Sequence, residues 1–386
     1  MHKKGGFFKD RVLPTTLLAG TIIGSGIFAL PFLFSGLGLG LSGALLLIFC
    51  GLFIGLHLMY GDIVLQEKAP HRLAWFARKT YGSVGYGVAF LVYILQLFLG
   101  LTIYIVLVPS FLRMVLPELN PIVGILGFWF LASLPGFVSN KKVALAEFIA
   151  MIGIIVVAIL VAIKGVPFLG GVDVTAIITT PLALLVPFGA LLYSNSGITA
   201  IPTIVHYFKD EHEKKSKSKN PIIIGTLIPA ILYLAFIAGV WGIAHISGVP
   251  ISEDGVSGII GWLPLWMVRG IGALGLLTLW SSYFPAVLDL KESLSFDVRI
   301  GGVLAGVLVL FVPILLYFAG LQNFIWLINI VGGLFLGVEG LLIIFLWRSI
   351  KKKSKHFLFS GNMIVWWMLF AIFVASIIYT VVVRIL

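Results

Sequence analysis

Hydrophobic residues run along this chain in long stretches that are separated by short polar loops. Eleven stretches are long enough to suggest helices that cross a bilayer, which need roughly 20 residues each. Because lipid offers no partner for backbone N–H and C=O groups, such stretches are predicted to be α-helical. We therefore expect an all-α polytopic membrane protein with a single transmembrane domain over residues 1–386. The predicted spans lie at about 12–37, 41–66, 83–115, 121–139, 143–165, 178–208, 221–246, 264–290, 298–319, 322–347 and 361–385.

Composition supports lipid as the medium around the protein. Of the 386 residues, 60% are hydrophobic and 11% are charged, whereas soluble domains carry about 25% charged residues. Cys50 is the single cysteine, so neither an intramolecular disulfide nor a cysteine metal cluster is expected. The net charge of +11 could suggest a nucleic-acid partner, but the positive residues sit in alternate loops and no base-reading motif accompanies them. No nucleic-acid partner is expected.

The loop charges predict an orientation. Twenty-two of the 26 Lys and Arg residues fall at the N-terminus and in the loops after even-numbered spans. Cytoplasmic loops are enriched in Lys and Arg. This split predicts a multi-pass protein of the cell membrane with a cytoplasmic N-terminus and an external C-terminus. The four remaining basic residues are Arg113, Lys164, Arg269 and Arg384.

A short sequence in the first span returns in the sixth. Residues 24–31 read GSGIFALP and residues 195–202 read NSGITAIP, with five of eight positions identical. The second copy comes five spans after the first, an odd number, so the two halves should have opposite orientations. We predict an inverted repeat of five plus five spans, about 12–165 and 178–347, followed by one extra helix at about 361–385.

Both copies are poor helix formers at the middle of a membrane span. Glycine loses more backbone entropy than any other residue when it is held in a helix. A single Gly-x-Gly is also typical of close helix packing. Two nearly identical copies in equivalent spans instead favour discontinuous helices around a shared binding site, with spans 1 and 6 interrupted.

A broken helix offers both halves of a binding site for a zwitterion. Amide N–H groups at the start of one half-helix can bind a carboxylate, and free carbonyls at the end of the other can bind an ammonium group or a cation. The candidate amides belong to Ser25, Gly26 and Ile27. The candidate carbonyls belong to Ile22, Tyr193 and Ser194. The full set of candidate substrate residues is Ile22, Ile23, Gly24, Ser25, Gly26, Ile27, Phe28, Tyr193, Ser194, Asn195, Ser196 and Gly197.

Three blocks of the chain resemble the amino acid–polyamine–organocation superfamily, and within it the amino acid/auxin and aromatic amino acid permeases. The blocks are TIIGSGIFALP at 21–31, PFGALLYSNSG at 187–197, and SSY at 281–283 with LDLKE at 288–292. The resemblance follows spans 1–10 in order. It implies a LeuT-type fold and secondary active transport of an amino acid, neutral and hydrophobic or aromatic, by alternating access and cation-coupled symport.

The resemblance also suggests where a coupling ion would bind. In sodium-coupled relatives the ion lies between carbonyls of span 1 and a Ser/Thr pair on span 8, positions that correspond here to Gly20, Ile23, Ser281 and Ser282. Some proton-coupled relatives use a Lys in the middle of span 5, where this chain has none. This favours sodium and leaves protons open. No cofactor and no obligate protein partner are expected.

One further candidate is an acid inside the predicted tenth span. Intramembrane acids are rare and often functional, so Glu339 is a candidate proton carrier or gate residue. The alternative is an acid that is hydrogen-bonded at a helix contact. An ion channel or an amino acid sensor on the same scaffold is the alternative to a permease. The sequence contains no Walker A, His-Glu-x-x-His or Gly-x-Ser-x-Gly motif, so an enzyme is not expected.

Overall fold

The computed structural model is a helical bundle. It describes residues 11–67, 71–133, 141–171, 181–212, 215–296, 298–351, 358–359 and 363–385, and these contain no β-strand. The helices are α1 (Leu13–Ile22), α2 (Gly26–Phe34), α3 (Leu39–Val64), α4 (Leu73–Val115), α5 (Pro121–Ser133), α6 (Lys141–Gly165), α7 (Phe188–Asn195), α8 (Ile201–His212), α9 (Lys219–Ser247), α10 (Leu265–Phe296), α11 (Gly302–Phe318), α12 (Phe324–Asn329), α13 (Gly337–Lys351) and α14 (Met363–Tyr379). Between α12 and α13 lies a π-helical segment, η8 (Ile330–Leu336).

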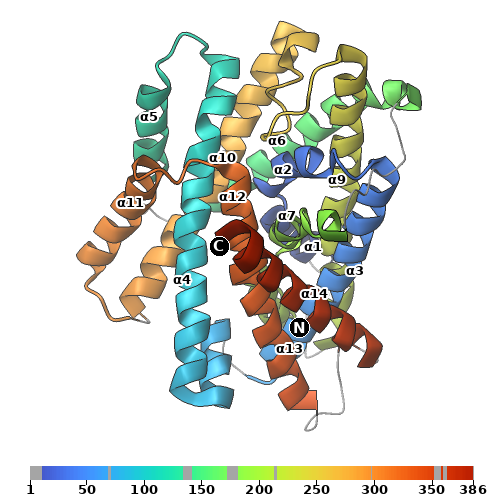
Figure 1. Cartoon of the computed structure of the whole chain (residues 1–386). Helices are drawn as coiled ribbons and strands as arrows, with labels where there is room; N and C mark the ends of the chain where they lie inside the picture. Colours follow the sequence, from blue (N-terminus) through green and yellow to red (C-terminus); the bar gives the residue numbers. More distant parts are fainter. Residues whose placement is uncertain are drawn as a thin grey trace, which may run out of the picture.

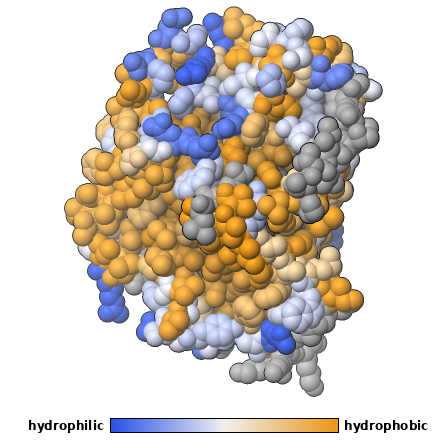
Figure 2. Space-filling view, in the orientation of Figure 1, coloured by the Kyte–Doolittle hydropathy of each residue, from blue (hydrophilic) through white to orange (hydrophobic). Residues whose placement is uncertain are grey.

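Most of the predicted spans are helices long and apolar enough to cross a membrane. Eight pass this test among the described residues, and the bent pair α1 and α2 makes a ninth. The apolar helices α5 and α11 are shorter, and Trp129 of α5 donates to Leu310 O of α11 at 2.8 Å. The total of eleven spans therefore stays a prediction. Hydrophobic residues cover most of the middle of the face in Figure 2, with hydrophilic residues towards the top and bottom.

The first predicted interruption is present in the structure. Helix α1 ends at Ile22, Ile23 is extended with ψ 99°, and α2 begins at Gly26. The two halves are bent by 55° relative to each other. Figure 1 shows both halves inside the bundle, between α4 on one side and α3 and α9 on the other.

The second predicted interruption is present as well, and it is longer. Helix α7 ends at Asn195 and Ser196 is extended with ψ 120°. After Gly197 a single 3₁₀ turn, η5 (Ile198–Ala200), leads into α8. Pro202 stands at the second position of α8, where its missing N–H costs no helical hydrogen bond.

Glycine lets the two interrupted helices approach closely. A Cβ on Gly26 would lie 2.5 Å from Ser194 Oγ and 2.9 Å from Ser194 Cα. A Cβ on Gly197 would lie 2.6 Å from Leu18 Cδ1 and 2.7 Å from Ile22 Cγ1. Gly26 therefore lies against the backbone of α7 at a position that only glycine fits, and Gly197 lies against side chains of α1.

Two features add detail to the predicted helices. The structure has a short helical stretch before the third predicted span, which begins at Leu73 and meets the rest of α4 at Gly82, whose φ of 69° is non-helical. The tenth span was expected as one helix. It contains η8, and π-helical turns inside α-helices are frequent at functional sites.

Candidate functional site

A tyrosine from α9 joins the two breaks. The Tyr233 hydroxyl lies 2.9 Å from Ile22 O and 3.1 Å from Ser194 O, and it donates its one proton towards both. The Gly24 amide also hydrogen-bonds to this hydroxyl. Tyr233 is fully buried. It therefore satisfies backbone groups that both interruptions set free, and it holds them at one place in the bundle.

Four hydroxyl groups form a second connection through the site. Ser25 Oγ lies 3.0 Å from the Tyr193 hydroxyl. Tyr193 hydrogen-bonds to Tyr104 of α4, which also hydrogen-bonds to Ser282 of α10. The chain Ser25, Tyr193, Tyr104 and Ser282 thus links both broken helices to α4 and α10. Hydroxyl groups both donate and accept, so the chain can rearrange around a polar ligand.

Several residues of the site keep some solvent-accessible surface, although their neighbours are buried. They are Gly24, Tyr104, Tyr193, Ser196 and Ser282. The remaining candidate substrate residues are buried: Ile22, Ile23, Ser25, Gly26, Ile27, Phe28, Ser194, Asn195 and Gly197.

Groups that a ligand could bind remain at both breaks. Helix α2 has no side-chain cap at its N-terminus, so its first amides have no such acceptor. At the other break, Asn195 Nδ2 donates to Leu191 O at 2.8 Å, while its buried Oδ1 has no hydrogen-bond partner among the described residues. The site therefore offers donors from the first break and an acceptor from the second.

A histidine of α3 supports the second break. The Gly197 amide donates to His57 Nε2 at 3.1 Å. Because Nε2 accepts this bond, Nδ1 must carry the ring proton, and it lies 3.0 Å from Thr226 Oγ1. The Thr226 hydroxyl in turn donates a hydrogen bond to Ile222 O at 2.8 Å. This chain of donors defines a neutral imidazole that holds the break.

The four residues predicted for sodium are not joined by the contacts that the structure shows. Gly20 faces α6, where a Cβ would lie 3.2 Å from Met151 Sδ. The Ser281 hydroxyl donates to Thr278 O at 3.0 Å on its own helix, and Ser282 belongs to the hydroxyl chain. Ile23 lies in the first break. A sodium site at these residues stays a prediction.

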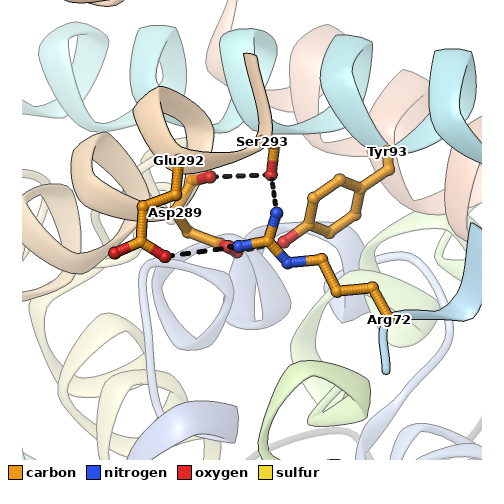
Figure 3. Close-up of polar contacts among 5 residues, drawn as sticks. All are labelled: Arg72, Tyr93, Asp289, Glu292 and Ser293. Atoms are coloured by element: carbon orange, nitrogen blue, oxygen red, sulfur yellow. Dashed lines mark hydrogen bonds and ion pairs between the residues drawn. The ribbon is translucent and has the colours of Figure 1, made fainter. Parts of the chain in front are cut away.

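A charged network lies where the segment before α4 meets α10 (Figure 3). Arg72 Nη2 lies 2.8 Å from Asp289 Oδ1 and 3.5 Å from Glu292 Oε2. Tyr93 donates to the second oxygen of Asp289, and Ser293 accepts from Arg72. All five side chains point towards one another in Figure 3. The network connects α4 and α10 through partly exposed charges.

At the opposite end, a polar loop covers the first broken helix. A Cβ on Gly255 would lie 2.5 Å from Phe28 O, and the φ of 69° at this glycine also favours no side chain. The neighbouring Val256 and Ile259 are each 1% exposed. The loop therefore packs directly on α2.

Hydrogen bonds to Asp254 organise this loop. Its Oδ1 accepts from Ser252 Oγ at 2.7 Å and from the Ser257 amide at 2.9 Å. Burial by itself raises the pKa of the Asp254 carboxyl, but hydrogen bonds from Ser110, Ser257 and Ser252 outweigh it, so the pKa lies below its ordinary value. The carboxylate form thus stabilises the folded loop.

Glu339 lies apart from this site, in the first turn of α13. Its side chain is buried, with the residue 4% exposed, and it hydrogen-bonds to Gln96 of α4. Its Oε2 has no hydrogen-bond partner among the described residues.

A family assignment accounts for this combination of broken helices and polar contacts. Residues 9–382 match the model of the tryptophan/tyrosine permease family. The chain belongs to the tryptophan/tyrosine permease family. The resemblance to amino acid permeases of the amino acid–polyamine–organocation superfamily is thereby confirmed, and the family is one of multi-pass membrane permeases.

Known proteins agree with the permease assignment. The chain is 25% identical over 247 residues to glutamine transporter 2 of Aliivibrio fischeri, a match that covers 60% of this chain and 62% of that relative. Among solved structures, Mhp1, a nucleobase-cation-symport-1 family transporter in a closed conformation with bromovinylhydantoin bound, has a TM-score of 0.66 at 14% identity, over 96% of this chain and 91% of that one. MhsT in complex with L-phenylalanine has a TM-score of 0.58 at 14% identity, over 100% and 99%. The permease therefore has a LeuT-type fold.

Proposed function

We propose that this permease carries a neutral hydrophobic or aromatic amino acid by alternating access, with accumulation driven by a sodium or proton gradient. The observation that carries the proposal is the meeting of two broken helices at Tyr233 and at the Ser25–Tyr193 contact. The family description names tryptophan and tyrosine, a relative is named as a glutamine transporter, and one structural neighbour holds L-phenylalanine. These names support an amino acid as substrate.

The substrate carboxylate would bind at the start of α2. The amides near Ser25, Gly26 and Ile27 lie at the positive end of a helix dipole, and no side chain caps them. The ammonium group would bind near the carbonyls of Ile22, Tyr193 and Ser194. Two of these carbonyls already accept from Tyr233, and each oxygen has a second lone pair that an ammonium could use.

Aromatic and hydroxyl groups would contact the substrate side chain. Phe28 packs edge to face against Phe111 and Phe236, with ring centroids 4.8 and 5.9 Å apart. Tyr104 and Ser282 contribute hydroxyl groups to the site, and both residues keep some solvent-accessible surface. An aromatic substrate with a hydroxyl or indole N–H would satisfy both kinds of group, because it combines an apolar ring with one polar atom.

Membrane topology completes the proposal. We infer eleven spans, with an inverted repeat over about 12–165 and 178–347 and an extra helix at about 361–385. The N-terminus would be cytoplasmic and the C-terminus external in the cell membrane, as 22 of 26 basic residues favour. Sodium, if it is the coupling ion, would bind near Gly20, Ile23, Ser281 and Ser282.

Transport into proteoliposomes tests the proposal. Purified protein would be given labelled tryptophan, tyrosine, phenylalanine and glutamine under an inward sodium gradient, an inward proton gradient, or neither. We expect accumulation above equilibrium under one gradient and exchange without either. Ion flux without any amino acid dependence would favour the channel. Substrate-induced thermal stabilisation without transport or exchange would favour the sensor.

A further inference from the structure

Two acids buried among the spans differ in their partners. Asp62, near the C-terminal end of α3, accepts from Trp347 Nε1 at 2.9 Å and from the amides of Leu358 and Phe359 at 2.6 and 3.3 Å. Glu339 has Gln96 as its partner and an Oε2 with none among the described residues. Trp347 lies eight residues after Glu339, about 12 Å along α13. The surroundings of Asp62 therefore stabilise a carboxylate, whereas those of Glu339 do not.

Glu339 also lies outside any ion pair of the described residues. A buried carboxylate without a cation or a full set of donors is costly, so such a group takes up a proton. The helices packed against α13 are α3, α4 and α14 together with η8. Among the described residues of these elements, Tyr60 of α3 and Tyr93 of α4 interact electrostatically with Glu339. Arg72 and Asp289, the charged groups beyond Tyr93, pair with each other.

One proton would complete the contact between Glu339 and Gln96. Gln96 Oε1 is a buried acceptor without a donor among the described residues, like Glu339 Oε2. Protonation turns a carboxyl oxygen into a donor. A neutral carboxyl can then donate to an amide oxygen while it accepts from the amide nitrogen. A single bound proton would therefore give each of the two oxygens a partner.

A polar path leads from this pair to the charged network of Figure 3. Gln96 follows Tyr93 by three residues on α4, so the two side chains lie on neighbouring positions of one helix face. Tyr93 donates to Asp289, whose side chain is 30% exposed and pairs with Arg72. The groups along the path can each donate or accept a proton or a hydrogen bond, from the partly exposed Asp289 to the buried Glu339.

The same acid is mechanically connected to the second break. Segment η8 directly precedes α13, and a Cβ on Gly332 of η8 would lie 1.8 Å from Gly189 O of α7 and 3.1 Å from Tyr193 Cβ. A shift of α13 on gain or loss of a proton would therefore press on the helix that carries Tyr193. Irregular π-helical turns provide a place where such a shift can occur.

We propose that Glu339, paired with Gln96, binds the coupling proton, and that Tyr93 and Asp289 connect this site to the cytoplasmic surface. The proposal rests on the proposed permease function and names its coupling ion. On substrate binding or release the O–H bond of the Glu339 carboxyl forms or breaks, and its proton comes from or goes to water at the Asp289 end, without any redox change.

Proton-driven accumulation by Glu339→Gln in proteoliposomes tests the proposal. Glutamine keeps the size and the hydrogen bonds of the neutral acid. We expect normal substrate binding and counterflow exchange, but no accumulation under an inward proton gradient. In weakly buffered detergent solution, substrate binding should change the number of protons bound to the wild type and not the number bound to Glu339→Gln. Asp62→Asn is the matched control and should keep proton-driven accumulation in the folded fraction.

Several results would overturn the proposal. Unchanged proton-driven accumulation by Glu339→Gln is one, and accumulation of substrate by the wild type under sodium alone is another. The latter leaves the permease function standing, whereas a wild type without any amino acid binding or exchange would refute that function itself. If Glu339→Gln does not fold, Glu339→Asp should retain coupling with a shifted pH profile, and Gln96→Leu should weaken coupling. An unchanged pH profile in both variants would equally contradict the role of Glu339.

Discussion

The two helix breaks have nearly the same sequence and are supported differently. At the first break, an added Cβ on Gly24 would meet no atom within 4 Å, and the chain resumes as α2 without a cap. At the second, the Gly197 amide is held by His57, and Gly197 itself packs on Leu18 and Ile22. The first break thus leaves backbone groups for a ligand, while the second is braced by the surrounding helices.

This difference suggests distinct roles for the two copies. Backbone groups that water or a ligand must satisfy are free to change partner, whereas a fully bonded amide keeps its geometry. We infer that the first break supplies the amides for the substrate carboxylate, whereas His57 fixes the backbone of the second break at Gly197. Tyr233 touches both, so it sets their spacing.

The largest effect is expected where the two breaks touch. Gly26→Ala would place a methyl group 2.9 Å from Ser194 Cα, a backbone atom that cannot turn away. Overpacking of this kind costs up to about 3 kcal/mol of unfolding free energy. We expect lost transport and a lowered melting temperature in detergent. Gly24→Ala is the matched control for stability, because its methyl group has open space. Equal melting temperatures for the two variants would contradict the close contact.

The second-largest effect is expected when the hydrogen bond between His57 and the Gly197 amide is removed. His57→Ala leaves the buried Gly197 N–H without its acceptor, which costs about 2 kcal/mol. We expect lower thermal stability and slower exchange of substrate. His57→Gln, whose amide oxygen can accept, should recover part of both. If glutamine restores nothing, the histidine acts by packing rather than by its hydrogen bond.

Removal of the Tyr233 hydroxyl, which links the two breaks, should have a smaller effect on stability. Tyr233→Phe removes one hydroxyl that donates to two carbonyls, worth about 1 kcal/mol. Because those carbonyls are proposed to hold the substrate ammonium, we expect a changed apparent affinity alongside the loss of stability. Tyr283→Phe is the control, since that buried hydroxyl accepts one long bond of 3.4 Å from Ser133. An unchanged apparent affinity in Tyr233→Phe would show that the hydroxyl of this tyrosine does not contribute to substrate binding.

The smallest effect is expected on the stability of the loop that covers the first break, when Asp254 is protonated or replaced. The pKa of Asp254 is depressed in the folded state, so its contribution to stability is present above the ordinary aspartate pKa of about 3.9 and is lost as pH falls through the folded value. We expect protease cleavage of this loop to rise below about pH 4. Asp254→Asn should remove that pH dependence, and Glu253→Gln, at an exposed neighbour, should keep it. A pH dependence that survives Asp254→Asn would point to another group.

Much of the fold follows from local sequence. The apolar segments, both interruptions and the candidate residues around Gly26 and Gly197 were predictable, because chain entropy and hydropathy act along a few neighbouring residues. The substrate residues predicted at the two breaks are brought together by direct contacts, of which Ser25–Tyr193 is one. The sodium residues are not joined in this way, since Ser281 bonds within its own helix.

The partners of the breaks could not be read from the sequence. Tyr233 and His57 lie in other spans, at positions that no local pattern relates to Ile22 or Gly197, and a polar residue inside an apolar span was the one available signal. Asp62 and Glu339 show the same limit. Both are acids in hydrophobic segments, yet Asp62 receives three donors and Glu339 has an oxygen with none among the described residues.

The sequence by itself determined that this is a helical membrane protein whose first and sixth predicted spans are interrupted, because hydropathy and glycine placement are properties of the local chain. Only the tertiary structure decided which break is braced, which hydroxyls join the two, and which buried acid lacks partners. Those outcomes depend on side chains that packing brings together from distant spans, where a shift of about an ångström makes or loses a hydrogen bond.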